Sequence, residues 1–221
     1  MRSGLARYLI GRAIEAVEIL DPRSLRRQAG GPGAFARQLA GRTVTAAVRR
    51  GKFLWLPLDD GRALSAHLGM SGQLLVRGAV AEPHDDVEGA RIAGRVDAHR
   101  AGPMATRAPT LVHEPSIRPR HLRVRLHLAP IDGDASDGAF VDLVDQRVFG
   151  GLHVTDLVPT SDGEPGGRGS PDALLPDDAR HIARDLLDPA LDRRDAAARM
   201  RSSGRAIKTI ILDQRIVSGV G

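Results

Sequence analysis

The chain has 221 residues, which is enough to bury a substantial core in one large domain or two small ones. Hydrophobic residues make up 42% and charged residues 27% of it, as in globular proteins, and no apolar run approaches the roughly 18–20 residues of a membrane span. The formal charge of +5 comes mainly from arginine and suits a polyanionic partner, although a GC-rich genome also favours arginine, and the lack of cysteine excludes disulfides and cysteine-ligated zinc within these residues.

The first 48 residues predict two helices and a strand. Residues 2–10 have the apolar spacing of an amphipathic helix, and residues 13–20 alternate apolar and polar side chains, which indicates a strand. Residues 34–40 predict a short helix entered through a Gly-Pro-Gly turn. The run 43–48, which contains several β-branched residues, leads into the next element.

Residues 49–72 predict a β-hairpin. An apolar run is followed by Asp-Asp-Gly, with Gly61 supplying the positive φ that a tight turn requires, and then by a second strand. The hairpin begins with Lys52 beside two arginines, and it ends with His67 and Met70 between small residues. These residues are unusual enough to carry a functional hypothesis.

Residues 77–120 change to Gly, Ala, Pro, Asp, Arg and His with little periodicity, which predicts a disordered insertion or a binding loop. His84, His99 and His113 lie in it. Their wide and irregular spacing favours solvated histidines over metal ligands.

Strict alternation over 121–128 predicts the clearest strand of the chain. One face is apolar, and the other is either the exposed side of an ordinary strand or a basic surface suited to nucleic acid. Further strands are expected over 140–144 and 152–158. The basic face carries His121, Arg123, Arg125 and His127.

The C-terminal part predicts a change of structural class. Residues 159–171 have the composition of a linker, and short helices are expected over 176–181, 195–200 and 206–212. We therefore predict an α+β fold: a β-sandwich-like domain with flanking helices over 1–158, then a partial all-helical domain over 172–221.

Four separated blocks carry a resemblance to a known family. They are Arg50-Gly51-Lys52-Phe53-Leu54, His67-Leu68-Gly69-Met70-Ser71-Gly72, Asp145-Gln146-Arg147-Val148-Phe149-Gly150, and Ile207-Lys208 through to Ser218-Gly219-Val220-Gly221. With these blocks in this order, the chain resembles the bacterial formamidopyrimidine-DNA glycosylases, which excise oxidised purines such as 8-oxoguanine and nick the abasic site by β-elimination. The resemblance implies a helix–two-turn–helix arrangement for the helical part.

An enzyme that acts on a base in duplex DNA takes the base out of the stack, so another group must fill the hole. By resemblance, Met70 and Phe149 fill the stack and Arg147 addresses the orphaned base. Core packing is the alternative for either apolar residue, but the neighbouring glycines favour exposed turns.

The resemblance also assigns the remaining site residues. Lys52 matches a lysine that donates a proton during β-elimination, with a surface lysine as the alternative, and Ser203 stands where many relatives have a DNA-contacting lysine. Other positions that match the family's DNA-contacting elements are His67, His121, Lys208, Gly219 and Gly221.

Other family features are not found in these residues. Family members begin with Pro-Glu-Leu-Pro-Glu, in which the terminal proline is the nucleophile and the adjacent glutamate the acid–base group, whereas this chain begins Met-Arg-Ser-Gly. The family's asparagine and four-cysteine zinc finger would follow Gly221. We interpret the chain as truncated at both ends and catalytically impaired as given, without a cofactor.

The resulting prediction is a monomeric, cytoplasmic, nucleoid-associated protein of base excision repair whose partner is damaged double-stranded DNA. Three alternatives stay open. The chain could be a non-catalytic DNA-binding remnant, a weak lyase that uses Lys52 at preformed abasic sites, or a gene fragment without a function of its own.

Overall fold

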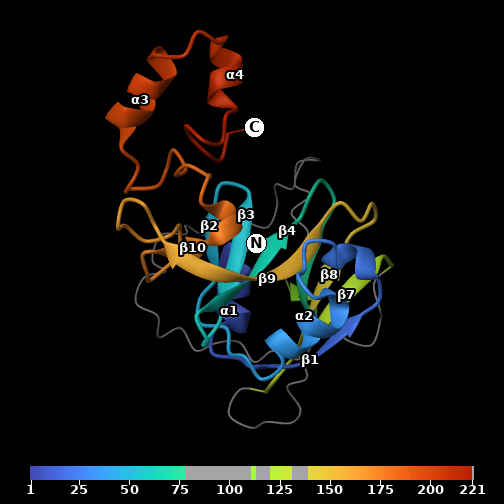
Figure 1. Cartoon of the computed structure of the whole chain (residues 1–221). Coiled ribbons are helices and arrows are strands. Elements are labelled where there is room, and N and C mark those ends of the chain that lie inside the picture. The colour runs from blue at the N-terminus through green and yellow to red at the C-terminus, as the bar shows by residue number, and fades with distance from the viewer. Residues whose placement is uncertain (78–110, 113–119, 131–138, 221) are drawn as a thin grey trace, which may run out of the picture.

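The computed structural model describes residues 1–77, 111–112, 120–130 and 139–220, which form a mixed α+β fold with two five-stranded sheets (Figure 1). The helices are α1 Arg2–Leu9, η1 Pro22–Leu25, α2 Gly31–Leu39, η2 Asp177–Ala179, α3 Arg193–Arg201 and α4 Ile207–Ile211. The strands are β1 Ile14–Ile19, β2 Val48–Arg50, β3 Phe53–Pro57, β4 Arg62–His67, β5 Gln73–Arg77, β6 Leu111–Val112, β7 Leu122–Leu128, β8 Ala139–Val144, β9 Gly151–Pro159 and β10 Leu174–Pro176.

Both sheets are mainly antiparallel. The first has the order β1-β7-β8-β5-β6, with β5 and β6 parallel, and the second has the order β10-β9-β4-β3-β2. In the first sheet Val124 lies opposite Leu143 and Leu126 opposite Val141. Because side chains alternate along a strand, this register sends these four side chains to one buried face.

One apolar core joins the two sheets and the N-terminal helices. Each fully buried leucine or phenylalanine in it contributes roughly 1.5–3 kcal/mol. This confirms the coarse part of the predicted class, an α+β fold in which helices flank two sheets. The most buried members include Leu5, Leu9, Phe35, Leu39, Leu56, Leu64, Val124, Val141, Leu143 and Leu152.

Most of the predicted elements are confirmed, with shifted ends. Helix α2 begins at Gly31, three residues earlier than expected, because Pro32 fits the first turn of a helix, where its missing N–H costs no hydrogen bond. The run 43–48 adds only isolated bridges before β2. Of the predicted insertion 77–120, Arg77 ends β5 and residues 111–112 form β6, while the three histidines in it lie outside the described residues.

Strand β7 confirms the alternation over 121–128, but the interpretation of its arginines as a basic surface for nucleic acid is wrong. Arg125 is 5% exposed, donates bonds of 2.7 and 2.8 Å to Asp142 on β8, and lies over the ring of Phe140. The hydrogen bond to Asp142 raises the pKa of Arg125. Arg123 binds the carboxylate of Asp21. A buried carboxylate needs a cationic partner, so these arginines stabilise the sheet.

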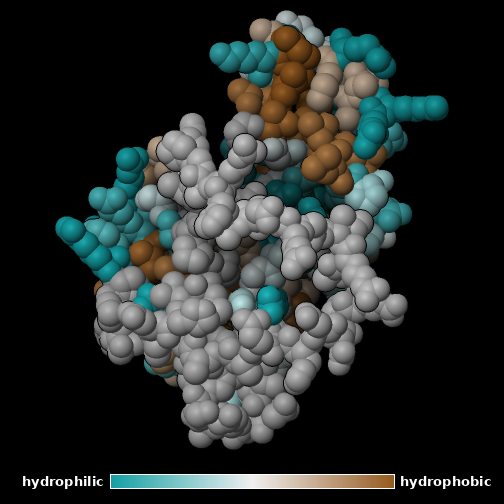
Figure 2. Space-filling view, turned by 180° about the vertical axis from the view of Figure 1, so that it is seen from behind, coloured by the Kyte–Doolittle hydropathy of each residue, from teal (hydrophilic) through white to brown (hydrophobic). Residues whose placement is uncertain are grey.

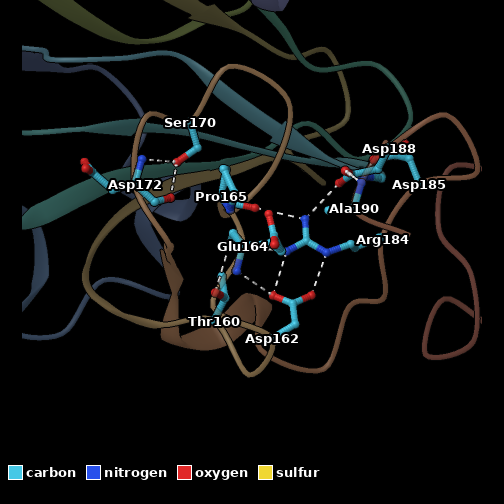
Figure 3. A network of polar contacts seen from close by, with 11 residues as sticks. Thr160, Asp162, Glu164, Pro165, Ser170, Asp172, Arg184, Asp185, Asp188 and Ala190 are labelled. Carbon is cyan, nitrogen blue, oxygen red and sulfur yellow. Dashed lines mark hydrogen bonds and ion pairs between the residues drawn. The ribbon is translucent and has the colours of Figure 1, made fainter. Parts of the chain in front are cut away.

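The predicted linker, residues 159–171, is fastened to the guanidinium of Arg184 (Figure 3). Arg184 is 5% exposed and donates two 2.7 Å bonds to Asp162, one of 3.0 Å to Asp188 and one of 2.9 Å to the carbonyl oxygen of Pro165. The hydrogen bonds from Arg184 lower the pKa of Asp162 to about 2. The segment is therefore held against the residues that follow it, and a domain boundary within it stays a prediction.

The last described residues form a lobe with α3 and α4, set apart from the sheets (Figure 1). Between the sheets and this lobe, the helix predicted over 176–181 is only the short η2, because Ala183 donates its N–H to the carbonyl of Gln214 instead of continuing a helix. Figure 2 shows apolar side chains gathered on the lobe. Ile207, on α4, is 63% exposed, and Leu187, which precedes α3, is 87% exposed. The helix–two-turn–helix arrangement stays a prediction.

Candidate functional site

The pairing of the hairpin brings its two notable ends to one edge of the second sheet. Leu54 lies opposite Ala66, so Lys52, just before β3, lies at the same edge as the residues just after β4. On the other side of β4, His67 lies opposite Gly151. Two loops project from this edge: residues 68–72 after β4, and residues 145–150 between β8 and β9.

Met70, Arg147 and Phe149 come together at the tips of these two loops. The Arg147 Nη1 lies 3.8 Å from the Met70 Sδ, and Gly69 packs so closely on Phe149 that a Cβ there would lie 3.0 Å from the Phe149 Cβ. Met70 is 78% and Phe149 50% exposed. The alternative of core packing is therefore wrong for both residues.

A single carboxylate, that of Asp145, organises both loops. It is 1% exposed and accepts bonds of 2.6 Å from the Ser71 hydroxyl, 2.7 Å from the Gly150 N–H and 3.1 Å from the Arg147 N–H. Burial by itself raises the pKa of Asp145, but these hydrogen bonds together hold the pKa below its usual value. The carboxylate thus fixes one loop through a side chain and the other through its backbone.

Backbone conformation in the second loop is unusual at Val148, which has a φ of 56°. This left-handed region is a genuine outlier for a β-branched residue and costs on the order of 1–3 kcal/mol. Arg26 donates a 2.7 Å bond to the carbonyl oxygen of Val148 and a second bond to that of Phe149. Asp145 and Arg26 therefore hold the loop from its two sides.

The two candidate histidines lie at the same edge. His121 has a φ of 67° and accepts a 3.0 Å bond from the Asp145 N–H at its carbonyl oxygen, which places it at the base of the second loop. His67 is half-buried, and burial together with the charges of Arg27 and Arg26 lowers its pKa. Both effects favour the neutral form of the imidazole.

Lys52 is exposed on the turn between β2 and β3, and Asp185 fastens this turn to the C-terminal lobe. The Gly51 N–H donates a 2.8 Å hydrogen bond to the Asp185 carboxylate, and the Arg49 guanidinium forms an ion pair with the same carboxylate at 3.2 Å. Gly219, with a φ of 83°, lies against the same carboxylate, where a Cβ would be 2.5 Å from Oδ1. The structure thus brings the lysine turn and the glycine turn together.

The remaining candidates stand apart. Lys208 is exposed at the start of α4, and no described contact joins it to the group above. Gly221 lies outside the described residues. Sequence reasoning missed Asp145, Arg26 and Asp185 as the residues that hold the loops and the turn. Asp145 is part of the 145–150 block, but nothing in the sequence indicated that its carboxylate binds both loops.

The described residues offer no ready set of metal ligands. Within the described parts of the chain, no three His, Cys, Asp or Glu side chains gather in a group that could hold a metal ion. The zinc that the resemblance implies needs four cysteines, and the sequence has none. Nor do the described helices include one that is long and apolar enough to cross a membrane.

The arrangement suits insertion into a polymer of stacked rings. Two exposed apolar tips flank a guanidinium, all three on loops fixed by buried hydrogen bonds. A lysine and histidines share the edge, and neither residues 68–72 nor residues 146–150 contain an Asp or Glu. The chemistry is therefore that of a rigid apolar wedge with cationic surroundings.

Comparisons with known proteins point to a single family. The family model of the formamidopyrimidine-DNA glycosylase N-terminal domain matches residues 1–152. The whole chain is 42% identical to a formamidopyrimidine-DNA glycosylase of Nocardioides sp. and 40% identical to one of Kineococcus radiotolerans, and it spans 57% and 62% of their lengths.

A solved relative has the same fold. The Lactococcus lactis protein in complex with DNA containing FAPY-dG matches 100% of this chain and 61% of its own, with a TM-score of 0.62 and 19% identity. At this identity the likeness concerns the fold alone. The chain thus spans about three-fifths of the length of the relatives it matches.

Proposed function

The chain belongs to the formamidopyrimidine-DNA glycosylase family, and we propose that it recognises damaged duplex DNA for base excision repair, with oxidised purines as the substrate class. The observation that carries the proposal is the exposed group of Met70, Arg147 and Phe149 on loops fixed by Asp145. Exposed apolar tips are costly in water unless a partner covers them. A stack of bases is such a partner.

In this proposal the damaged base leaves the duplex and the loop tips replace it. Unstacking costs a few kcal/mol, which apolar contacts of Met70 and Phe149 with the neighbouring bases offset. The Arg147 guanidinium donates hydrogen bonds to the orphaned base. His67 and His121, at the base of the loops, contact the DNA backbone.

Lys52 is the proposed proton donor in β-elimination at the abasic site. Asp185 holds the turn that carries Lys52, and this turn lies at the end of the sheet from which the two loops project. The C2′ proton passes to water, the 3′ phosphate departs and an unsaturated sugar is left, and the Lys52 ammonium can donate a proton to the oxygen of the departing phosphate. Gly219 and Lys208 add contacts to the phosphate backbone.

Base excision itself needs a nucleophile, and the family's Pro-Glu start is not among these 221 residues. We therefore expect the 221-residue polypeptide to bind duplex containing an abasic-site analogue with little excision of 8-oxoguanine. A second candidate function, weak nicking of preformed abasic sites through Lys52, is favoured by the exposure of this amine at the site edge.

The test uses the 221-residue polypeptide and three duplexes: undamaged, 8-oxoguanine and abasic. We expect binding that weakens steeply with salt and prefers the abasic duplex, and little adduct when borohydride is added to the 8-oxoguanine duplex. Binding that is indifferent to salt would refute nucleic-acid recognition. Efficient trapping through the N-terminal residue would refute the expected impairment, and nicking unchanged in Lys52→Ala would refute its role.

A further inference from the structure

The sulfur atom of Met70 gives the wedge formed by Met70, Arg147 and Phe149 a chemistry that apolar contact does not use. The chain has four methionines and no cysteine, so thioethers are its only sulfur groups. Among the described methionines Met70 is the most exposed, at 78% against 51% for Met1, and Met200 on α3 is half-buried. Water and small dissolved oxidants therefore reach the sulfur of Met70 directly.

A guanidinium faces this sulfur. The Arg147 Nη1 donates to the Met70 Sδ at 3.8 Å, and no carboxylate is paired with the exposed Arg147 side chain in the described parts of the chain. A thioether is a weak acceptor, so this contact contributes little as it stands. An oxygen atom added to the sulfur would be a strong acceptor within reach of the same donor.

The loops hold the sulfur and the guanidinium in this arrangement. The Ser71 hydroxyl and the Arg147 N–H bind the same Asp145 carboxylate, at 2.6 and 3.1 Å. The Gly72 N–H donates a 2.8 Å bond to the Leu68 carbonyl, which closes residues 68–72 into a turn. The two groups therefore face each other at the surface before any ligand arrives.

We propose that Met70 is a site of reversible oxidation by hydroperoxides, and that its sulfoxide, bonded to Arg147, weakens recognition by the wedge. With hydrogen peroxide, the sulfur lone pair attacks one oxygen and the O–O bond breaks. The departing hydroxide removes the proton of the transferred oxygen and leaves as water. The sulfur is oxidised by two electrons and the peroxide is reduced, and the Arg147 guanidinium donates to the new oxygen.

The effect on DNA rests on the proposed function and adds a form of regulation to it. A sulfoxide is polar, so its oxygen enters a stack of bases only at the cost of its hydrogen bonds to water. If Arg147 stays bonded to this oxygen, its guanidinium is no longer available to the orphaned base. Both effects weaken binding to an abasic duplex, whereas contacts with the backbone of an undamaged duplex do not need the wedge.

The first experiment follows the oxidation itself and does not involve DNA. The 221-residue polypeptide is treated with hydrogen peroxide, and the sulfoxides are measured by mass spectrometry of its peptides. We expect Met70 to be oxidised at least about 3-fold faster than Met200, because its sulfur is more exposed. Equal rates at the two methionines would overturn the site.

The same samples test the contact with Arg147. Because the guanidinium lies on one side of the sulfur, we expect one sulfoxide epimer at Met70 to exceed the other, and nearly equal amounts in Arg147→Leu. The two classes of methionine sulfoxide reductase, each of which reduces one epimer, measure the ratio. Equal epimers in the wild-type chain, or a ratio that Arg147→Leu leaves unchanged, would contradict the bond to Arg147.

The second experiment measures affinity for abasic and undamaged duplexes by anisotropy, before and after peroxide. We expect oxidation to lower the preference for the abasic duplex about 5- to 30-fold, and the reductases to restore it. Met200→Leu is the matched control and responds to peroxide as the wild-type chain does. Met70→Leu, compared with its own untreated sample, keeps whatever preference it has.

Two outcomes separate this proposal from the proposed function. If peroxide lowers the abasic preference of Met70→Leu as much as that of the wild-type chain, the effect arises elsewhere and the role of Met70 is overturned. If the untreated polypeptide has no abasic preference but Met70 is oxidised fastest and to one epimer, the proposed function fails and the oxidation site stands.

Discussion

Replacement of Asp145 by asparagine tests whether one carboxylate holds both loops of the wedge. The carboxylate accepts hydrogen bonds from Ser71, Arg147 and Gly150 at 2.6, 3.1 and 2.7 Å. Asparagine keeps one acceptor oxygen and turns an amide N–H₂ toward the remaining donors. An orphaned buried N–H costs about 1–3 kcal/mol, and the loss of charge weakens the other bonds by about 1 kcal/mol. We expect the free energy of unfolding to fall by about 2–4 kcal/mol.

The assay is urea unfolding followed by the fluorescence of Trp55, the one tryptophan of the chain, which is 1% exposed. Binding to abasic and undamaged duplexes is measured by anisotropy under conditions in which the variant is folded. We expect the preference for the abasic duplex to fall several-fold because the tips lose their fixed geometry, while affinity for undamaged duplex changes little. Asp156→Asn, exposed on β9, removes the same charge and is the control.

The pH dependence provides a second readout. Because the folded-state pKa of Asp145 is lowered, the carboxylate stabilises the fold above its unfolded-state pKa, and this stabilisation is lost as pH falls through the folded-state value. The difference between wild type and Asp145→Asn therefore shrinks below about pH 4. If Asp145→Asn has the same free energy of unfolding as Asp156→Asn and keeps the preference for the abasic duplex, the reasoning is refuted.

Three further outcomes are expected. Arg125→Met leaves the buried Asp142 without its bidentate partner and lowers the free energy of unfolding by about 3 kcal/mol or more. The duplex affinity of the folded protein stays the same, and a weakened affinity would support a DNA-binding role for Arg125. Asp162→Asn lowers the free energy of unfolding by only about 1 kcal/mol above pH 4, because the Asp162 side chain is 41% exposed and solvent screens its charge. The difference in Tm between wild type and variant vanishes as pH falls toward the folded-state pKa of about 2. Asp185→Asn weakens the hydrogen bond that the Gly51 N–H donates, so hydrogen exchange of the Gly51 amide accelerates at least about 10-fold. Unchanged protection of this amide would refute the role of Asp185 in holding the turn.

Much of the β fold could be predicted because its signals are local. Strand β7 follows from alternation, and the β3–β4 hairpin follows from Asp-Asp-Gly between apolar runs. The exposed tips could be inferred at Met70 and Phe149 because glycines flank them. In each case a few neighbouring residues contain the whole signal.

The parts that could not be predicted depend on partners distant in sequence. Alternation predicts that Arg125 faces away from the leucines, but its burial depends on Asp142, which is 17 residues away on the next strand. Arg26 reaches carbonyls that are more than 120 residues away, and Asp185 reaches an N–H 134 residues away. Periodicity within one segment contains no information on such contacts, so the residues that hold the site were missed.

The left-handed Val148 has a consequence for the affinity of the wedge for DNA. Valine disfavours this conformation in a free chain, so the loop adopts it only when the Asp145 and Arg26 bonds form, that is, during folding. If the loop binds DNA as proposed, the entropy of ordering the Phe149 loop is already lost before DNA arrives, and association does not bear that cost again. Val148→Gly would remove the backbone strain and so stabilise the loop locally. It would also allow the loop to adopt more conformations, so the loop would be less preorganised.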